Sequence, residues 1–81
     1  MIDILFFGRL GDVSERLHIE IPQGLTDTDG LSSWLSEQNV ALGIELGKVG
    51  NRIALNKTII TASSPLNDGD EIAYMSPLSG G

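Results

Sequence analysis

Alternating apolar side chains at the start of the chain predict a β-strand. In "IDILFFGRL", one face carries only apolar residues, namely Ile2, Ile4 and Phe6. The other face carries Asp3 and then two more apolar residues, Leu5 and Phe7. We expect the wholly apolar face to pack into the core, which leaves Leu5 and Phe7 as apolar side chains on an outer face.

A second alternation, in "RLHIEI", predicts the next strand. Its inward positions hold Leu17, Ile19 and Ile21. Its outward positions hold His18 and Glu20. The segment "GRLGDVSE" between the two strands is rich in glycine and polar residues, so we expect it to form a hairpin loop.

Helical spacing follows in "LTDTDGLSSWLSEQN". The residues at i, i+3, i+4 and i+7 are mostly apolar: Leu31, Trp34, Leu35 and Gln38. Asp27 stands where an N-cap is expected, and Asp29 places a negative charge in the first turn, which the helix dipole favours. The pattern predicts one amphipathic helix, followed by an irregular, glycine-punctuated connection in "GIELGKVGN".

The last third of the chain predicts short strands separated by turns. "RIALN" and "TIIT" flank a turn expected at residues 56–57, and "NDGDEIAYM" begins with a turn at residues 68–69. In the final strand, Ile72 and Tyr74 share one face, and the opposite face holds Ala73 and Met75. Proline at position 77 then ends the strand, because it has no N–H group to donate to a neighbouring strand.

The order of these elements is two strands, one helix and then two or three more strands. This order predicts an α+β fold, with a mixed sheet of four to five strands packed on one main helix. A chain of 81 residues is expected to form one domain. We expect that domain to span residues 1–76, and residues 77–81 to form a flexible C-terminal tail.

The net charge, the absence of cysteine and the N-terminal segment indicate which partners and which compartment to expect. The formal net charge is −6 at pH 7, and a surface of this sign repels nucleic acid and anionic membranes, so we expect a basic protein surface as partner. Cysteine is absent, which excludes disulfides, thiolate metal sites and a cysteine nucleophile and agrees with a reducing cytosol. The opening "MIDILFF" lacks the basic and small-residue features of a signal peptide, so we expect a cytoplasmic protein.

Three side-chain patterns resemble known sites but lack an essential part. "GIELGK" is one residue shorter than a phosphate-binding loop, and Val49 follows it in place of the Ser or Thr that binds magnesium. "DTDG" at residues 27–30 lacks the later acidic ligands of a calcium loop. His18 is the single histidine, and no catalytic partner can be assigned to it. We therefore expect no metal site, no cofactor cradle and no catalytic side chain.

The remaining reactive group is the α-carboxylate of Gly81, at the end of "PLSGG". Five extended residues from position 77 span at most about 16–18 Å, enough to enter a partner's active site. Gly80 has no side chain to clash in a narrow channel. Burial of apolar side chains against the partner would offset the entropy lost when the tail becomes ordered. The side chains that we expect at this interface are Leu5, Phe7, Met75 and Leu78.

Four segments together resemble a known family. They are "ILFFGRL" at 4–10, "LSSWL" at 31–35, "IALN" at 53–56 and "LNDGDEIAYMSPLSGG" at 66–81. The chain resembles, over its whole length, the small subunits of molybdopterin synthases, which are sulfur carriers with the ubiquitin-like β-grasp fold. The terminal diglycine is common to all β-grasp carriers and modifiers, whereas the combination with the "LFF-x-R-L" opening is more specific.

The resemblance implies a function that depends on other proteins. An E1-like adenylyltransferase would use ATP to convert the carboxylate of Gly81 to an acyl-adenylate, and sulfur derived from a cysteine desulfurase would then make a thiocarboxylate. The large synthase subunit, with which the chain is expected to form a heterotetramer, would receive the tail and pass the sulfur to cyclic pyranopterin monophosphate. The chain itself would bind no cofactor and would not be catalytic alone.

Three residues depart from the pattern of this family. Gly8 stands where alanine is more frequent, which we expect to weaken the end of the first strand slightly. Thr28 occupies a helix position that is usually apolar, so we expect a loose first turn. Met75 replaces a frequent aromatic residue but keeps the apolar character.

Other functions agree with the same terminal glycines. A sulfur carrier of the thiamine pathway has the same fold, although its chains are typically shorter and lack the "LFF-x-R-L" opening. A ubiquitin-like modifier would use the same activated glycine to join lysines of target proteins. A binding module with an inert tail would form no adenylate at all.

Overall fold

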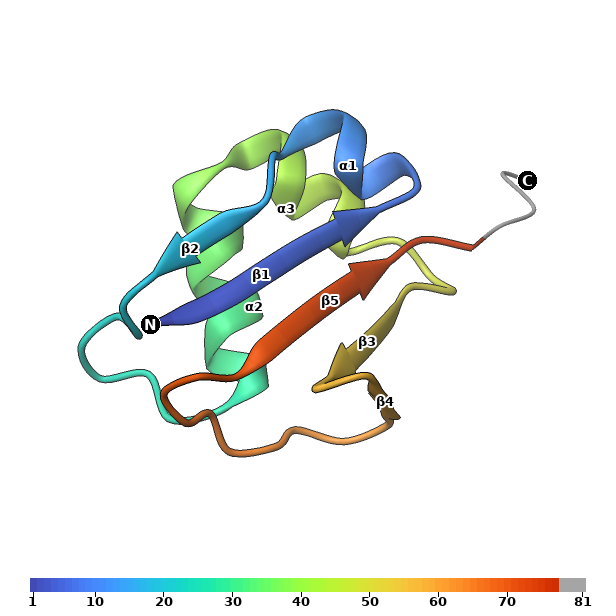
Figure 1. Cartoon of the computed structure of the whole chain (residues 1–81). Helices are drawn as coiled ribbons and strands as arrows, with labels where there is room; N and C mark the ends of the chain where they lie inside the picture. Colours follow the sequence, from blue (N-terminus) through green and yellow to red (C-terminus); the bar gives the residue numbers. More distant parts are fainter. Residues whose placement is uncertain (78–81) are drawn as a thin grey trace.

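A mixed sheet covered on one face by helices makes up residues 1–77, the part of the chain that the computed structural model describes (Figure 1). The elements in chain order are β1 (Ile2–Phe7), α1 (Arg9–Val13), β2 (Leu17–Ile19), α2 (Thr28–Gln38), α3 (Val40–Leu46), β3 (Arg52–Leu55), β4 (Thr58–Ile60) and β5 (Glu71–Met75). No helix in this part of the chain combines the length and the apolar character that crossing a membrane requires.

The first and last strands lie side by side at the centre of the sheet. The strand order is β2-β1-β5-β3-β4, and β1 runs parallel to β5 while the other neighbouring pairs are antiparallel. A parallel pair needs a long crossover connection, and the segment between β1 and β5 supplies it with α2 packed across the sheet. The five-stranded mixed sheet confirms the predicted α+β class.

The core lies between the sheet and the helices. The strands contribute the residues that the alternation placed inward, among them Ile2, Ile4, Ile72 and Tyr74, and the helices contribute Leu10, Leu31, Leu35 and Leu42. Phe6 packs against this cluster, and its ring stacks on that of Tyr74 with 5.7 Å between the centroids. The two-residue period of β1 and β5 therefore identified the buried face correctly.

The first turn of α2 is firmly held rather than loose. As predicted, Asp27 is the N-cap, and its Oδ1 accepts a hydrogen bond from the Gly30 N–H at 2.8 Å. Thr28 is buried, donates its N–H to the Ser64 carbonyl at 2.9 Å and accepts the Ser64 N–H on Oγ1 at 3.1 Å. The expectation of a loose turn at Thr28 was wrong, because its hydroxyl accepts the Ser64 N–H, which an apolar side chain could not do.

Two predicted loops contain helices. The segment expected to be a hairpin loop forms α1, whose Leu10 is fully buried. The segment expected to be an irregular connection begins within α3, which starts at Val40 and includes residues 43–46 of "GIELGK". Both helices are short, five and seven residues, so neither repeats an apolar stripe often enough to be distinguished from a loop.

The predicted turns are confirmed. Asn56 and Lys57, between β3 and β4, both have positive φ angles of 49° and 71°, as in the tight turns that match the twist of a hairpin. Gly69 has a φ of 91° in the turn that leads into β5. The chain then enters β5, which lies beside β1, and the C-terminal ends of these two central strands lie next to each other.

Candidate functional site

The sheet face opposite the helices carries an apolar patch toward the end of the central strands. Strand register places on it the residues paired across β1, β5, β3 and β4, and we call the following six the outer face: Leu5, Phe7, Ala54, Ile59, Ala73 and Met75. Phe7 is 51% exposed and Ile59 is 47% exposed, whereas the two alanines are nearly covered by their neighbours. Large apolar side chains left in water on one face of a sheet are typical of a surface that binds another protein.

A hollow of about 800 Å³ lies at one end of the outer face. It is lined by residues from three segments: Phe7, Gly8, Gly50, Arg52, Ile59, Met75, Ser76 and Pro77. Phe7 and Met75 are directly paired in the register of β1 and β5, and the chain leaves β5 at this point toward its C-terminus. The hollow therefore adjoins the start of the C-terminal segment, because Ser76 and Pro77 line it.

The structure brings together the predicted interface residues that it describes. Leu5, Phe7 and Met75 share the outer face, as the alternation indicated, and their role in binding a partner stays a prediction. Leu78, Gly80 and Gly81 lie outside the described residues.

Ile59 and Arg52 line the same hollow and were not among the predicted site residues. Ile59 pairs with Ala54, which places it on the outer face, and Arg52 pairs with Met75. The alternation in "RIALN" and "TIIT" could have placed both residues on one face. It could not show that β3 lies next to β5, because strand order is a long-range property.

Gly8 is required at the end of β1. Its φ is 67°, a backbone conformation that residues with a Cβ rarely adopt. A Cβ atom at this position would lie 1.9 Å from the Oγ of Ser76. The expectation that glycine weakens this strand end was wrong, because the turn from β1 into α1 and the neighbouring Ser76 leave space only for glycine.

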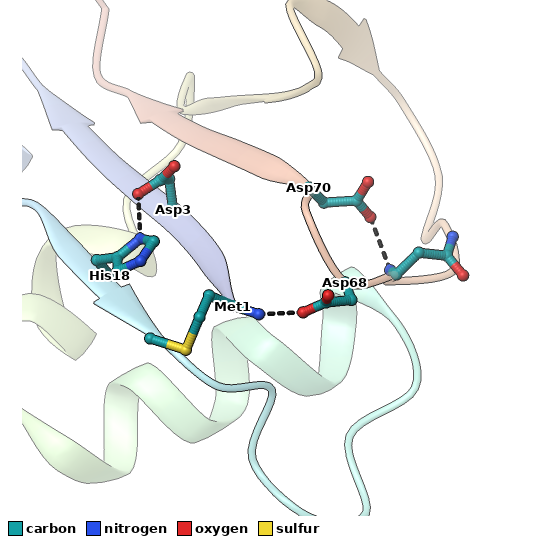
Figure 2. A network of polar contacts seen from close by, with 6 residues as sticks. Met1, Asp3, His18, Asp68 and Asp70 are labelled. Carbon is teal, nitrogen blue, oxygen red and sulfur yellow. Dashed lines mark hydrogen bonds and ion pairs between the residues drawn. The ribbon is translucent and has the colours of Figure 1, made fainter.

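The opposite end of the central strands carries a polar network (Figure 2). His18 Nδ1 lies 2.7 Å from Asp3 Oδ1, and Arg16 lies 3.4 Å from the same oxygen. The hydrogen bond with His18, assisted by Arg16, lowers the pKa of Asp3 below its ordinary value. The N-terminal ammonium group of Met1 also pairs with Asp68. These contacts fasten β1 to β2 and to the turn before β5, away from the hollow.

The described side chains contain few groups with unusual chemistry. Burial raises the pKa of Tyr74 to about 12, and its hydroxyl lies 2.9 Å from Ser32 Oγ, so it remains a neutral, hydrogen-bonded core residue. Within residues 1–77, no three His, Cys, Asp or Glu side chains gather closely enough to hold a metal ion. His18 is exposed on β2, as predicted. What the arrangement offers is a binding surface beside the exit of the C-terminal segment.

Comparison with known sequences finds matches along the whole chain. The model of the ThiS family matches residues 4–81. The molybdopterin synthase sulfur carrier subunit of Escherichia coli (strain K12) is 31% identical over 83 aligned positions, which cover all of both chains. The subunit of the same name from Haemophilus influenzae (strain ATCC 51907 / DSM 11121 / KW20 / Rd) is 28% identical, again over all of both chains.

Solved structures show the same architecture. A chain from the complex of subunits 1 and 2 of molybdopterin-converting factor from Helicobacter pylori 26695 superposes with a TM-score of 0.69 at 30% identity, covering 99% of this chain and 97% of that chain. SAMP1 from Haloferax volcanii superposes with a TM-score of 0.74 at 20% identity, covering 99% and 98%. These neighbours confirm that the fold is the ubiquitin-like β-grasp fold that the resemblance implied.

Proposed function

The chain belongs to the ThiS family, and on that premise we propose that it is the sulfur carrier subunit of a molybdopterin synthase. The observation that carries this proposal is the position of the exposed outer face, with Phe7 and Met75 beside the point where the chain leaves β5. A carrier needs such a surface, because the protein that activates or receives its terminus has to hold the folded body next to that terminus. The full-length match to two sulfur carrier subunits supports it.

The chemistry that we propose takes place at the α-carboxylate of Gly81. A carboxylate oxygen attacks the α-phosphorus of ATP on an E1-like adenylyltransferase, and pyrophosphate leaves. A persulfide formed by a cysteine desulfurase then attacks the acyl carbon and displaces AMP, which leaves an acyl disulfide on Gly81. A thiol reduces this disulfide, so that the thiocarboxylate of Gly81 is released and the thiol ends in a disulfide with the former persulfide cysteine. In this proposal the ATP site and the general base belong to the partners, and the chain contributes its terminus and the surface that binds them.

The second proposed step is delivery of the sulfur. The thiocarboxylate enters the large subunit of the synthase and gives its sulfur to cyclic pyranopterin monophosphate, and two rounds complete the dithiolene of molybdopterin. The similarity to a chain from the complex of subunits 1 and 2 of the Helicobacter pylori factor supports a large-subunit partner. Two copies of each subunit would form the expected heterotetramer.

The outer face would supply the binding energy for both encounters. Leu5, Phe7 and Met75, together with Leu78 beyond the described residues, would be removed from water against each partner. Ile59 lies on the same face and adds a fifth apolar side chain to this predicted interface. Such burial offsets the roughly 1–2 kcal/mol per residue that ordering the terminal segment costs.

The test is activation of the purified chain. With an E1-like adenylyltransferase and ATP, we expect pyrophosphate release that depends on the chain, and a matched chain lacking Gly80 and Gly81 serves as control. Addition of the desulfurase and a sulfur source should give an intact mass in which one sulfur replaces one terminal oxygen of Gly81. The product should then convert cyclic pyranopterin monophosphate in the presence of the large subunit.

Each step has its own contrary outcome. No pyrophosphate release would leave a binding module with an inert tail. A thiocarboxylated chain that fails with the large subunit would indicate another sulfur acceptor, such as one in the thiamine pathway. Covalent conjugates joined through Gly81 to lysines of other proteins would indicate a modifier instead.

A further inference from the structure

We propose that the start of the C-terminal segment is held in a two-sided clamp that directs the reactive terminus. The clamp consists of Ser76 against Gly8 and of Pro77 against Gly50. In this inference, which depends on the proposed function, these four residues are positioning residues for the activation of Gly81. They act through the direction of the chain and do not touch the reacting atoms.

The first side of the clamp is a pair of hydrogen bonds to Ser76. The last residue pair between β1 and β5 is Phe7 with Met75, so Ser76 is already beyond the sheet. The Oγ of Ser76 nevertheless accepts a hydrogen bond from the Arg9 N–H at 2.9 Å, and the backbone N–H of Ser76 donates to the Phe7 carbonyl at 3.4 Å. These contacts tie Ser76 to the junction between β1 and α1.

Gly8 provides the space that these hydrogen bonds need. The Oγ of Ser76 lies where a Cβ of residue 8 would be, only 1.9 Å from that position. With a φ of 67°, the backbone at Gly8 also turns the chain so that the following N–H, that of Arg9, points at Ser76. A side chain at position 8 would therefore displace Ser76 or change the turn.

The second side of the clamp comes from the segment between α3 and β3. Gly50 has a φ of 89°, and a Cβ there would lie 2.7 Å from the Cγ of Pro77. Proline holds its own φ near −65°, so a contact with its ring also restricts the direction of the chain. Two successive residues beyond β5 thus each lie against a glycine, and the two glycines come from opposite sides of the strand end.

The clamp matters because the terminus reacts inside another protein. The effective concentration of a tethered group falls as the flexible connection lengthens. If the chain were released at Met75, the connection from the docked outer face to Gly81 would gain two residues and would lose its fixed direction. Poor orientation of a reacting group lowers the rate of the chemical step even when binding is unchanged.

The experiment compares substitutions in the clamp with matched substitutions elsewhere. Gly50→Ala places a methyl group against Pro77, and Gly24→Ala is its control, because Gly24 has a similar φ of 88° with nothing within 4 Å of the added Cβ. Ser76→Ala removes the acceptor of the Arg9 N–H, and Ser33→Ala removes an exposed hydroxyl on α2. Each chain is assayed for ATP-dependent pyrophosphate release with the E1-like adenylyltransferase.

We expect Gly50→Ala and Ser76→Ala to lower kcat by on the order of tenfold, with KM for the chain nearly unchanged. Gly24→Ala and Ser33→Ala should behave as the unmodified chain. As a readout independent of activity, amide hydrogen exchange at Arg9 should accelerate in Ser76→Ala, because its acceptor is gone.

The outcomes separate this inference from the proposed function. If the unmodified chain releases no pyrophosphate, the proposed function fails and the clamp inference fails with it. If the unmodified chain is active and Arg9 exchange accelerates in Ser76→Ala while kcat is unchanged, the clamp is structural only and the inference is overturned. An increase in KM with constant kcat would also overturn it, because these residues would then contribute to docking.

Discussion

Phe7 keeps an aromatic ring half exposed at the end of a central strand, where it adds little to the stability of the fold. We expect Phe7→Asp to change the free energy of unfolding by less than about 1 kcal/mol, because an exposed side chain contributes little to the core. Affinity for the adenylyltransferase or for the large subunit should fall at least about tenfold, because a buried interface would receive an unpaired charge. Urea denaturation and titration calorimetry measure the two effects.

Phe6 is the matched control for this substitution. It precedes Phe7 in β1 but faces the core, where it stacks on Tyr74. Phe6→Asp should therefore cost several kcal/mol of stability, about 3 or more, as expected for a charge in a core position. If Phe7→Asp unfolds the chain as Phe6→Asp does, then Phe7 is a core residue and the outer face is not a docking surface.

Thr28 is a buried residue whose hydroxyl group accepts a hydrogen bond from the backbone of Ser64. Thr28→Val keeps the shape of the buried side chain but leaves the N–H of Ser64 without its acceptor. We expect a loss of about 1 kcal/mol in the free energy of unfolding, at the lower end of the cost of an unsatisfied donor because the hydrogen bond is only partly buried. Thr58→Val, at an exposed position in β4, should change stability by less than about 0.5 kcal/mol. Equal stability of Thr28→Val and the unmodified chain would show that the Ser64 N–H finds another partner.

Asp3 makes the free energy of unfolding depend on pH in the acid range. Its pKa is lowered by the hydrogen bond with His18 and by Arg16, so the folded chain favours its ionised form relative to the unfolded chain. This contribution is present above the ordinary value of 3.8 and is lost as the pH falls from there through the lowered folded pKa. Asp3→Asn should be less stable than the unmodified chain near neutral pH, and the difference should shrink below pH 3.8. Denaturation across this range measures it, and a difference that stays constant with pH would contradict the assignment.

At the scale of elements, the junction between α2 and α3 depends on one residue. The side-chain oxygen of Asn39 accepts the Leu42 N–H at 3.1 Å as the N-cap of α3, and its Nδ2 donates to the Val13 carbonyl at 3.0 Å. Asn39→Ala removes both bonds, and we expect a loss of about 1–2 kcal/mol in denaturation experiments. Asn39→Asp keeps the cap but loses the donor, so its loss should be smaller. Identical losses would mean that the N-cap contributes nothing.

The same junction shows why some elements were predictable and others were not. β1 and β5 repeat their apolar positions every second residue over five or six residues, which is enough to identify the strand and its buried face. α1 buries only Leu10, and α3 buries only Leu42. A single buried apolar residue gives no repeating pattern, so the sequence of each segment could not be told from that of a loop. Tertiary contacts and the cap at Asn39, rather than an apolar stripe, stabilise these helices.

At the scale of the whole molecule, the candidate site is assembled from segments that are far apart in the chain. The apolar character of Leu5, Phe7 and Met75 on outward positions could be predicted from alternation alone. The pairing of β1 with β5, the addition of Ile59 and the glycines around Ser76 and Pro77 could not, because they depend on strand order and on backbone angles.

The two ends of the central strand pair have different characters. The start of β1, with the ammonium group of Met1, lies among acidic residues that include Asp3, Asp68 and Asp70 (Figure 2). The end of β5 lies beside the apolar hollow, whose lining includes Arg52. A partner that receives the C-terminus therefore meets apolar side chains and a cation, while Asp3, Asp68 and Asp70 lie at the other end of these strands. This arrangement separates the groups that hold the fold together from the groups that we propose to bind.

That separation leads to a prediction for the whole chain. All residues of the core cluster lie between Ile2 and Tyr74, so deletion of Gly80 and Gly81 removes nothing that is buried in the described fold. We expect the midpoint of thermal unfolding to be unchanged and ATP-dependent pyrophosphate release to be lost, because the carboxylate would end at Ser79, two residues short of the activation site. Binding to the adenylyltransferase should persist, since the outer face is intact. Sulfur transfer by the shortened chain would show that the reactive group lies elsewhere, whereas loss of folding would show that the terminus is part of the structure and not a delivered group.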